Sequence, residues 1–566
     1  MEPDDPQDEP IDENDPLWKA VLKIAEGDRE KAVKMLEDPD ALMSFPDVKA
    51  IMDSGGAGDK AEEDWEASGF SVGALEKVPE KNAPPPETIS PMGATHEPST
   101  SKAASTPAAT EDDIEPGMDD SSGAQELDPR EHLNIVFIGH VDAGKSTLSG
   151  SILYIMGMVD ARTIERFERE AKQRNRESWF LAFILDTSEE ERAKGKTVEV
   201  GRAHFETPVN RYTILDAPGH KNYVPNMIAG AAQADVGVLV ISARKGEFET
   251  GFEKGGQTRE HALLAKTLGV QQLVVVINKM DDPTVQWDVE RYEYCVGKLK
   301  PYLKSCGFVI KNEVKFVPIS ALKGDNVQRI VATEDCPWWA AKVAAGEHNT
   351  TTPTLLSTLD AVRCTGRNPD GPLRMPCLDR YIERGCVVLG KIESGTLRMD
   401  DEIVIAPTRK RAKVDAIYVG DVKVRSAKPG ENVLLKMQVN AEDVQKGFVI
   451  CSARDLCTAS AVIKVQLVLV DLLEHRPIFC SGYEAVMHVH TLEVEVTCVE
   501  LIAVIDKGKQ MKRPFARNGQ VCLAKLTMPL PACVEAFSAF PSMGRVTLRD
   551  EGRTIAIGKI IEVIAT

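Results

Sequence analysis

The sequence lacks the features of several large classes of proteins. It contains no Cys-x-x-Cys pair, and its twelve cysteines all lie at or after Cys295, without partners at metal-ligand spacing. No apolar run reaches the roughly 18 uncharged residues of a membrane helix, and the acidic first residues contain no apolar segment of a secretory signal. These absences argue against a disulfide framework, a zinc site and a membrane span. We therefore expect a cytoplasmic protein that keeps its cysteines as thiols and does not enter a membrane.

Positive charge is scarce in the first part of the chain. Residues 1–130 hold 33 acidic and 11 basic side chains, whereas the rest of the chain holds 54 acidic and 57 basic ones. A uniformly acidic protein would be repelled by RNA, but a nearly neutral body can bind RNA through local basic patches. The cluster Arg-Lys-Arg-Ala-Lys at 409–413 fits either a solvent-exposed hairpin or such an RNA contact.

Composition and hydrophobic spacing divide the chain into five segments. Residues 1–54 have helical spacing and predict a small module, either a marginal helical hairpin or a docking unit for an unknown partner. Residues 55–130 predict a disordered acidic linker, because they are rich in Ala, Pro, Ser, Thr, Glu and Asp. Residues 131–345 predict an α/β domain with a mostly parallel sheet, whereas 352–452 and 453–566 predict two antiparallel β-barrels. The strands expected in the α/β domain span 133–138, 212–215, 236–242, 273–277 and 316–319.

The most specific motif is Gly-His-Val-Asp-Ala-Gly-Lys-Ser at 139–146, directly after an apolar run. It matches the phosphate-binding loop, in which glycines let successive backbone N–H groups point at a phosphate. A helix expected to start at Thr147 would add its positive end to the same site. Lys145 would contact the β and γ phosphates, and Ser146 would ligate Mg²⁺. The expected nucleotide contacts here are Gly139, Asp142, Ala143, Gly144, Lys145, Ser146 and Thr147.

Asp-Ala-Pro-Gly-His at 216–220 follows a second strand pattern. Asp216 is expected to order the water shell of the Mg²⁺, and Gly219 to present its N–H to the γ phosphate. These positions extend the predicted site from the nucleotide to its metal ion.

Asn-Lys-Met-Asp at 278–281 predicts how the base is recognised. The carboxylate of Asp281 can accept hydrogen bonds from N1–H and the amine of guanine, a donor pair that adenine does not offer. Asn278 is expected to contact the other edge of the base, and the stem of Lys279 to pack along its plane. Ser320, Ala321 and Leu322 would close over the guanine. The predicted ligand is therefore GTP or GDP.

Taken in this order, the motifs resemble the translational GTPases of the elongation factor 1-alpha family over about residues 131–566. The runs 195–202, 246–261, 544–552 and 554–558 are more specifically similar to its class II release-factor branch. The resemblance implies that Thr197, in the first switch loop, closes on Mg²⁺ when a γ phosphate is present. It also implies that His220 positions the attacking water once the ribosome has placed it. No arginine can be assigned as a finger in cis, so slow turnover with external activation is expected.

Within that branch, the implied function is translation termination. The chain would hydrolyse GTP while delivering the stop-codon-decoding class I release factor to the ribosome, and it would bind that factor through the C-terminal barrels. The charged run 544–558 is expected to belong to this docking surface, with a solvated turn as the alternative. Two other functions stay open: a ribosome-rescue GTPase acting with the paralogue of the class I factor, and a regulatory GTPase subunit of a metabolic enzyme.

Overall fold

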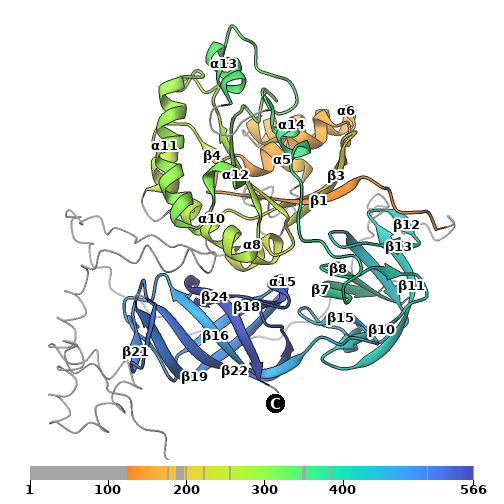
Figure 1. The fold of residues 1–566 in the computed structure, drawn as a ribbon. Coiled ribbons are helices and arrows are strands. Elements are labelled where there is room, and N and C mark those ends of the chain that lie inside the picture. Colours follow the sequence, from red (N-terminus) through yellow and green to blue (C-terminus); the bar gives the residue numbers. More distant parts are fainter. Residues whose placement is uncertain are drawn as a thin grey trace, which may run out of the picture.

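The computed structural model describes residues 124–564, apart from 175–176, 186–190, 192–196, 198–199, 221–222, 254–255, 347–351, 383–384 and 507. The helical module predicted for 1–54 lies outside the described residues. An α/β domain lies above two β-barrels, with the last barrel in blue and the other in teal (Figure 1). All twelve cysteines are free, and eleven of them are buried, which fits their expected role as small apolar side chains.

The α/β domain is built on a six-stranded sheet in the order β2-β3-β1-β4-β5-β6. Every pair in it is parallel except β2 with β3, so the expected sheet is confirmed. The sequence did not predict β2, because its polar residues lack a continuous apolar run. The strands are β1 (Glu131–Ile138), β2 (Gly201–Glu206), β3 (Asn210–Asp216), β4 (Val236–Ser242), β5 (Gln272–Asn278) and β6 (Val314–Pro318).

Two helix positions in this domain differ from the expectation. The first helix begins at Lys145 and not at Thr147, because Gly144 adopts a left-handed φ of 97° and caps it. The helix over 355–360 packs its leucines into the core of the α/β domain, although that stretch was assigned to the first barrel. The helices are α5 (Lys145–Ile155), α6 (Ala161–Gln173), α8 (Val224–Ala231), α9 (Glu247–Phe252), α10 (Gln257–Leu268), α11 (Val289–Ser305), α12 (Ile310–Glu313), α13 (Pro337–Ala345) and α14 (Leu355–Asp360), with 3-10 turns at Glu177–Trp179 and Ala182–Ile184.

The first barrel runs in the order β10-β15-β7-β8-β14-β11-β12 and closes through β10 and β11. The basic cluster 409–413 lies where β10 turns into β11, and its four basic side chains are exposed, which fits the expected hairpin. The strands are β7 (Arg374–Ile382), β8 (Cys386–Lys391), β9 (Leu397–Arg398), β10 (Glu402–Ala406), β11 (Lys410–Val419), β12 (Val422–Val424), β13 (Ser426–Ala427), β14 (Asn432–Met437) and β15 (Val449–Ser452), with a 3-10 turn at Ala441–Asp443.

The second barrel runs in the order β18-β23-β24-β16-β22-β19-β20 and closes through β18 and β19. Both predicted barrels are therefore present. The elements are β16 (Ala459–Leu469), β17 (Phe479–Cys480), β18 (Glu484–Val489), β19 (Leu492–Asp506), β20 (Lys509–Met511), β21 (Phe515–Ala516), β22 (Val521–Cys533), the one-turn α15 (Pro541–Gly544), β23 (Arg545–Asp550) and β24 (Arg553–Ile564).

Residues 124–130, expected to be part of the disordered linker, are ordered against the body. Gln125 N–H donates to the carbonyl of Lys423 at 2.9 Å, and Arg425 N–H donates to the carbonyl of Gln125 at 2.9 Å. Leu127 packs on the core of the first barrel. Arg130 donates to Thr207 O at 2.8 Å in the α/β domain. The prediction of disorder is wrong here, because composition does not reveal that a short segment can pair with the edge of β12. We call residues 124–130 the strap.

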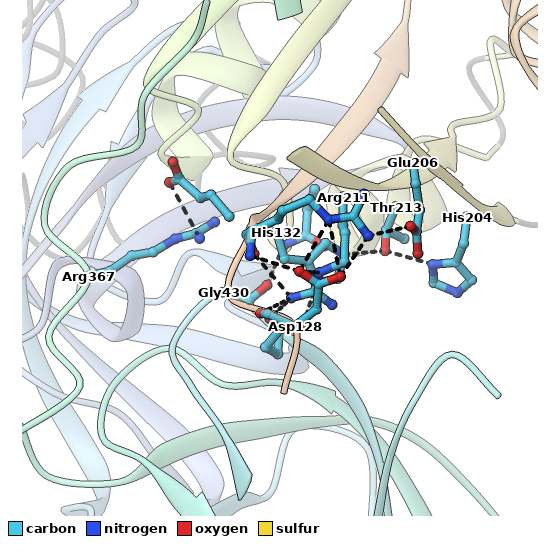
Figure 2. A network of polar contacts seen from close by, with 12 residues as sticks. Asp128, His132, His204, Glu206, Arg211, Thr213, Arg367 and Gly430 are labelled. Carbon is cyan, nitrogen blue, oxygen red and sulfur yellow. Dashed lines mark hydrogen bonds and ion pairs between the residues drawn. The ribbon is translucent and has the colours of Figure 1, made fainter. Parts of the chain in front are cut away.

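A buried polar network joins the α/β domain to the first barrel (Figure 2). Glu431 of the barrel is bonded to His132 Nδ1 at 2.6 Å and accepts from Arg211 Nη2 at 2.6 Å. His132 Nε2 lies 2.7 Å from Thr213 Oγ1, which lies 3.0 Å from His204 Nδ1. The network therefore reaches from the barrel to β1, β2 and β3 of the sheet.

Candidate functional site

The loop after β1 is shaped by glycines at both ends. Gly139 has φ 141° and Gly144 has φ 97°. A Cβ on Gly139 would collide with the carbonyl of Val240, and one on Gly144 would collide with the amide of Asn278. Only glycine fits both places, so the curled phosphate-binding loop predicted from the sequence is present and closely packed.

Lys145 is buried beneath this loop. Its Nζ donates to the carbonyls of Gly139 at 3.1 Å and His140 at 2.9 Å. Burial lowers its pKa to about 8, against the opposing charges of Asp216 and Asp142. A Cβ on Gly219 would collide with this Nζ, so the loop after β3 lies directly against the lysine. A desolvated ammonium held only by carbonyl oxygens is suited to an incoming phosphate.

Three oxygen-bearing side chains near Lys145 fit a magnesium ion. The hydroxyls of Ser146 and Thr197 lie 3.1 Å apart, across 51 positions of sequence. Both carboxylate oxygens of Asp216 are buried, and neither has a well-aligned hydrogen bond to a described residue. Burial raises the pKa of Asp216 to about 6, although nearby Ser146 and Lys145 act in the opposite direction. Hydroxyl and carboxylate oxygens are the ligands that Mg²⁺ prefers, so these residues fit the ion.

Asn278 connects the loops of the site. Its Nδ2 donates to Ala143 O at 2.9 Å, and its Oδ1 accepts from Ala321 N–H at 3.0 Å. The side chain is 2% exposed. The amide therefore holds the phosphate loop and the 320–322 loop together, and the expected contact with the base stays a prediction.

The remaining base-recognition residues divide by exposure. Asp281 is partly exposed and lies 3.5 Å from Lys323 Nζ. Leu322 is 45% exposed, whereas Ser320 and Ala321 are buried. Lys279 has a left-handed φ of 62° and pairs with Glu247 at 2.8 Å. Asp281, Leu322 and the stem of Lys279 can therefore reach a ligand, while Ser320 and Ala321 shape the backbone beneath it.

His220 follows Gly219 at the end of the same loop. Its side chain is partly exposed, and its ring centroid lies 5.9 Å from that of Tyr223 at the start of α8. Thr147 lies within the first turn of α5. Thr147 therefore directly follows the phosphate loop, and His220 directly follows the glycine that lies against Lys145.

Two residues of the site were not singled out from the sequence. Glu247 accepts from Ser242 Oγ at 2.7 Å and pairs with Lys279. His261 accepts from the N–H of Gly139 at 3.2 Å. Both residues lie in the run 246–261. The similarity of that run to the release-factor branch was the sequence feature that could have identified them.

The run 544–558 is not the exposed docking surface expected from its charges. Arg549 is 4% exposed and pairs with Glu260 of α10 at 3.2 Å. The guanidinium of Arg545 packs beside Gly269, which ends the same helix. The expectation is wrong for these two arginines, because they join the last barrel to the α/β domain. Only the turn 551–553 is exposed.

Comparisons with known proteins match all three domains. The elongation factor Tu GTP binding domain covers residues 130–363, elongation factor Tu domain 2 covers 385–451, and the GTP-eEF1A C-terminal domain-like family covers 463–561. Within the part that the structure describes, no helix is both long and apolar enough to cross a membrane.

Similar proteins include two release-factor subunits of fungi. The eukaryotic peptide chain release factor GTP-binding subunits of Kluyveromyces lactis and Schizosaccharomyces pombe are each 47% identical to this chain, over 441 and 440 residues. Each alignment covers 77% of this chain, and 61% and 64% of the two relatives. The chain thus spans less than two thirds of the length of these relatives.

Two solved structures are also similar to this chain. The structure of sup35 complexed with GDP is 40% identical, with 77% of this chain and 95% of that chain covered, and its TM-score is 0.35. The S. cerevisiae Ski7 GTPase-like domain bound to GTP is 19% identical over 76% of this chain and 97% of that chain, with a TM-score of 0.62, and it supports the fold alone. The sequence relatives and the family models show that the chain belongs to the family of eukaryotic peptide chain release factor GTP-binding subunits, within the translational GTPases.

Proposed function

We propose that this chain is a GTPase of translation termination that delivers a class I release factor to the ribosome. The observation that carries the proposal is the site itself. A buried lysine, two facing hydroxyls and a buried carboxylate meet under a glycine-shaped loop, in a chain 47% identical to release-factor subunits. Such a site is suited to a nucleoside triphosphate with its metal ion.

Binding would divide between the two ends of the site. Asp281 accepts the two donors of guanine, and Leu322 covers the base. The backbone N–H groups of 142–146 and the ammonium of Lys145 hold the phosphates. Ser146 and Thr197 would hold the Mg²⁺, and Asp216 would order its water shell. Bound Mg²⁺ neutralises charge that develops on the phosphate oxygens.

Hydrolysis would proceed by in-line attack of water on the γ phosphate. His220 orients that water, and the N–H of Gly219 and the ammonium of Lys145 stabilise the charge that develops. We propose that the ribosome brings His220 into position, so turnover by the chain alone is slow. This activity would place the protein in the cytoplasm.

The class I factor would bind the C-terminal barrels. Because Arg545 and Arg549 are used inside the molecule, the partner surface must lie elsewhere on the last barrel. The exposed apolar side chains of Val499 on β19 and Leu530 on β22 are suitable anchors, at 51% and 74% exposure. Residues 1–54 would dock a further, unidentified partner.

A reconstituted assay tests the proposal. GTP hydrolysis by the full chain is measured with ribosomes carrying a stop codon, together with either the class I factor or its ribosome-rescue paralogue. We expect strong stimulation with the class I factor. If only the paralogue stimulates hydrolysis, the chain functions in ribosome rescue. If ribosomes do not change the rate of hydrolysis, a role in translation is contradicted.

A further inference from the structure

Two consecutive residues of α10 contact different parts of the protein. His261 is fully buried, and its Nδ1 accepts the N–H of Gly139 at 3.2 Å. Glu260 accepts from Arg549 Nη1 at 3.2 Å and from Thr554 Oγ1 at 2.9 Å, both in the last barrel. One turn of helix therefore lies between the phosphate loop and the β23–β24 hairpin.

The chemistry of the contact fixes the state of His261. A backbone N–H can only donate, so Nδ1 must be the acceptor and Nε2 must carry the proton. Burial lowers the pKa of His261 to about 3, and the charge of Lys145 acts in the same direction. The ring is therefore neutral, and Nδ1 is available as an acceptor throughout the physiological range. Its Nε2 is buried without a hydrogen-bond partner among the described residues. Among the described residues, the hydrogen bond of this ring is therefore the one that Nδ1 accepts from the N–H of Gly139.

Gly139 is held on both sides as a result. Its N–H is fixed by His261, and its carbonyl accepts from Lys145 Nζ at 3.1 Å. A shift of His261 would move the peptide unit that positions the phosphate-binding lysine. His261 therefore acts on nucleotide binding without contacting the nucleotide.

The last barrel holds α10 at both ends. Arg549 is also bonded to Thr554 Oγ1 at 3.0 Å and to Gly552 O at 2.6 Å, so the side chain that meets Glu260 has a fixed orientation. At the other end of the helix, a Cβ on Gly269 would lie 2.8 Å from the guanidinium carbon of Arg545. The two branch-specific runs, 246–261 and 544–558, thus form one joint between domains.

We propose that His261 is a positioning residue for the phosphate loop, and that docking of the last barrel on Glu260 controls how tightly that loop retains a guanine nucleotide. The proposal rests on the proposed binding of GTP or GDP at 139–146. It predicts that a change in the barrel contact alters nucleotide release over a distance, through one helix.

Release of a fluorescent GDP analogue from the full chain, measured by stopped flow, tests this. His261→Leu removes the acceptor at similar volume and should raise the dissociation rate about tenfold, the effect of one lost hydrogen bond. His261→Asn keeps an acceptor at the δ position and should stay near the wild-type rate. Equal rates for His261→Leu and His261→Asn would show that packing alone matters and would overturn the role of Nδ1.

Glu260→Ala tests the barrel contact from the surface of the helix, so it does not depend on the buried histidine tolerating replacement. We expect it to raise the dissociation rate about threefold. Combined with His261→Leu, it should add nothing further, because both changes act on the same bond. Glu290→Ala, an exposed carboxylate in the first turn of α11, is the matched control. A wild-type rate for Glu260→Ala, or full additivity with His261→Leu, would overturn the coupling.

The two proposals fail in different ways. If the wild-type chain does not bind the GDP analogue, the proposed GTP site itself is wrong. If it binds and the variants release the analogue at the wild-type rate, the site stands and the role of α10 is wrong.

Discussion

We expect base selection to depend on the carboxylate of Asp281. It is the one acidic side chain of 278–281, and it is partly exposed beside Lys323. Asp281→Asn replaces one acceptor by a donor, so the pair of guanine donors no longer fits, whereas xanthine offers the complementary group. We expect the variant to lose GTP and to bind xanthosine triphosphate. Competition binding with both nucleotides measures this, and an unchanged preference for GTP would contradict the assignment.

His220 should affect catalysis and not affinity. It follows the glycine that abuts Lys145, and its ring centroid lies 5.9 Å from that of Tyr223. His220→Ala should bind GTP with the wild-type affinity and lose about 10²-fold or more of its ribosome-stimulated hydrolysis. Single-turnover hydrolysis on ribosomes, beside equilibrium binding of GTP, separates the two effects. Intact hydrolysis would remove His220 from the mechanism.

Individual residues show which features of the site could be predicted from the sequence and which could not. The lysine, serine and aspartate of the phosphate site were predicted because each motif places its residues within a few positions of one another. The role of Arg549 was misjudged, because its partner Glu260 lies 289 positions away. A charge pattern does not reveal whether it faces solvent or another domain.

Among the elements, continuous apolar runs were the reliable signal. β4 was predicted at its observed bounds and β5 to within one residue at each end, since both are buried on both faces and read as unbroken aliphatic stretches. β2 was missed because it is a polar edge strand. The strap was missed because its order comes from pairing with β12 and not from its own composition.

Two truncations distinguish the contribution of the strap to stability from that of the rest of the linker. Deleting residues 1–123 keeps Gln125, Leu127 and Arg130 and should leave the stability of the body unchanged. Deleting residues 1–130 removes the two backbone bonds to Lys423 and Arg425 and the packing of Leu127, at a cost of about 2 kcal/mol. Urea unfolding of both truncations measures the difference.

Leu127→Ala in the full chain is the matched control for this deletion, and it should reproduce part of the loss. Equal stability of the two truncations would show that the strap adds nothing to the folded body.

Across the three domains, buried or partly buried ion pairs recur at each joint. Glu431 meets His132 and Arg211 between the α/β domain and the first barrel, Arg374 meets Glu535 at 2.7 Å between the barrels, and Arg549 meets Glu260 at the third joint. Buried pairs add little net stability but disfavour other arrangements, since a displaced domain leaves a charge unpaired. The three joints therefore define one domain arrangement, and a partner that opens one of them must supply a new contact for the freed charge.

The contribution of the ion pairs at one joint can be tested by measuring how the stability of the protein depends on pH, because Glu431 is a titratable member of that joint. Burial raises its pKa, but the bond to His132 and the charge of Arg211 outweigh burial and hold the pKa below its ordinary value of 4.5 (Figure 2). A carboxylate with a depressed pKa contributes stability that is present above the unfolded value and lost as the pH falls through the folded value.

Glu431→Gln should therefore lower the free energy of unfolding by about 2 kcal/mol at neutral pH. The gap from wild type should narrow as the pH falls from about 4.5 through the lower pKa of the folded state, because the carboxyl of the unfolded wild-type chain then takes up a proton before the folded one does. Unfolding measured between about pH 3 and pH 7 gives both numbers. Glu442→Gln, an exposed carboxylate of the same barrel, should leave the profile unchanged. A gap that is the same at every pH would mean that Glu431 acts by shape alone, and that its charge does not hold the barrel against the α/β domain.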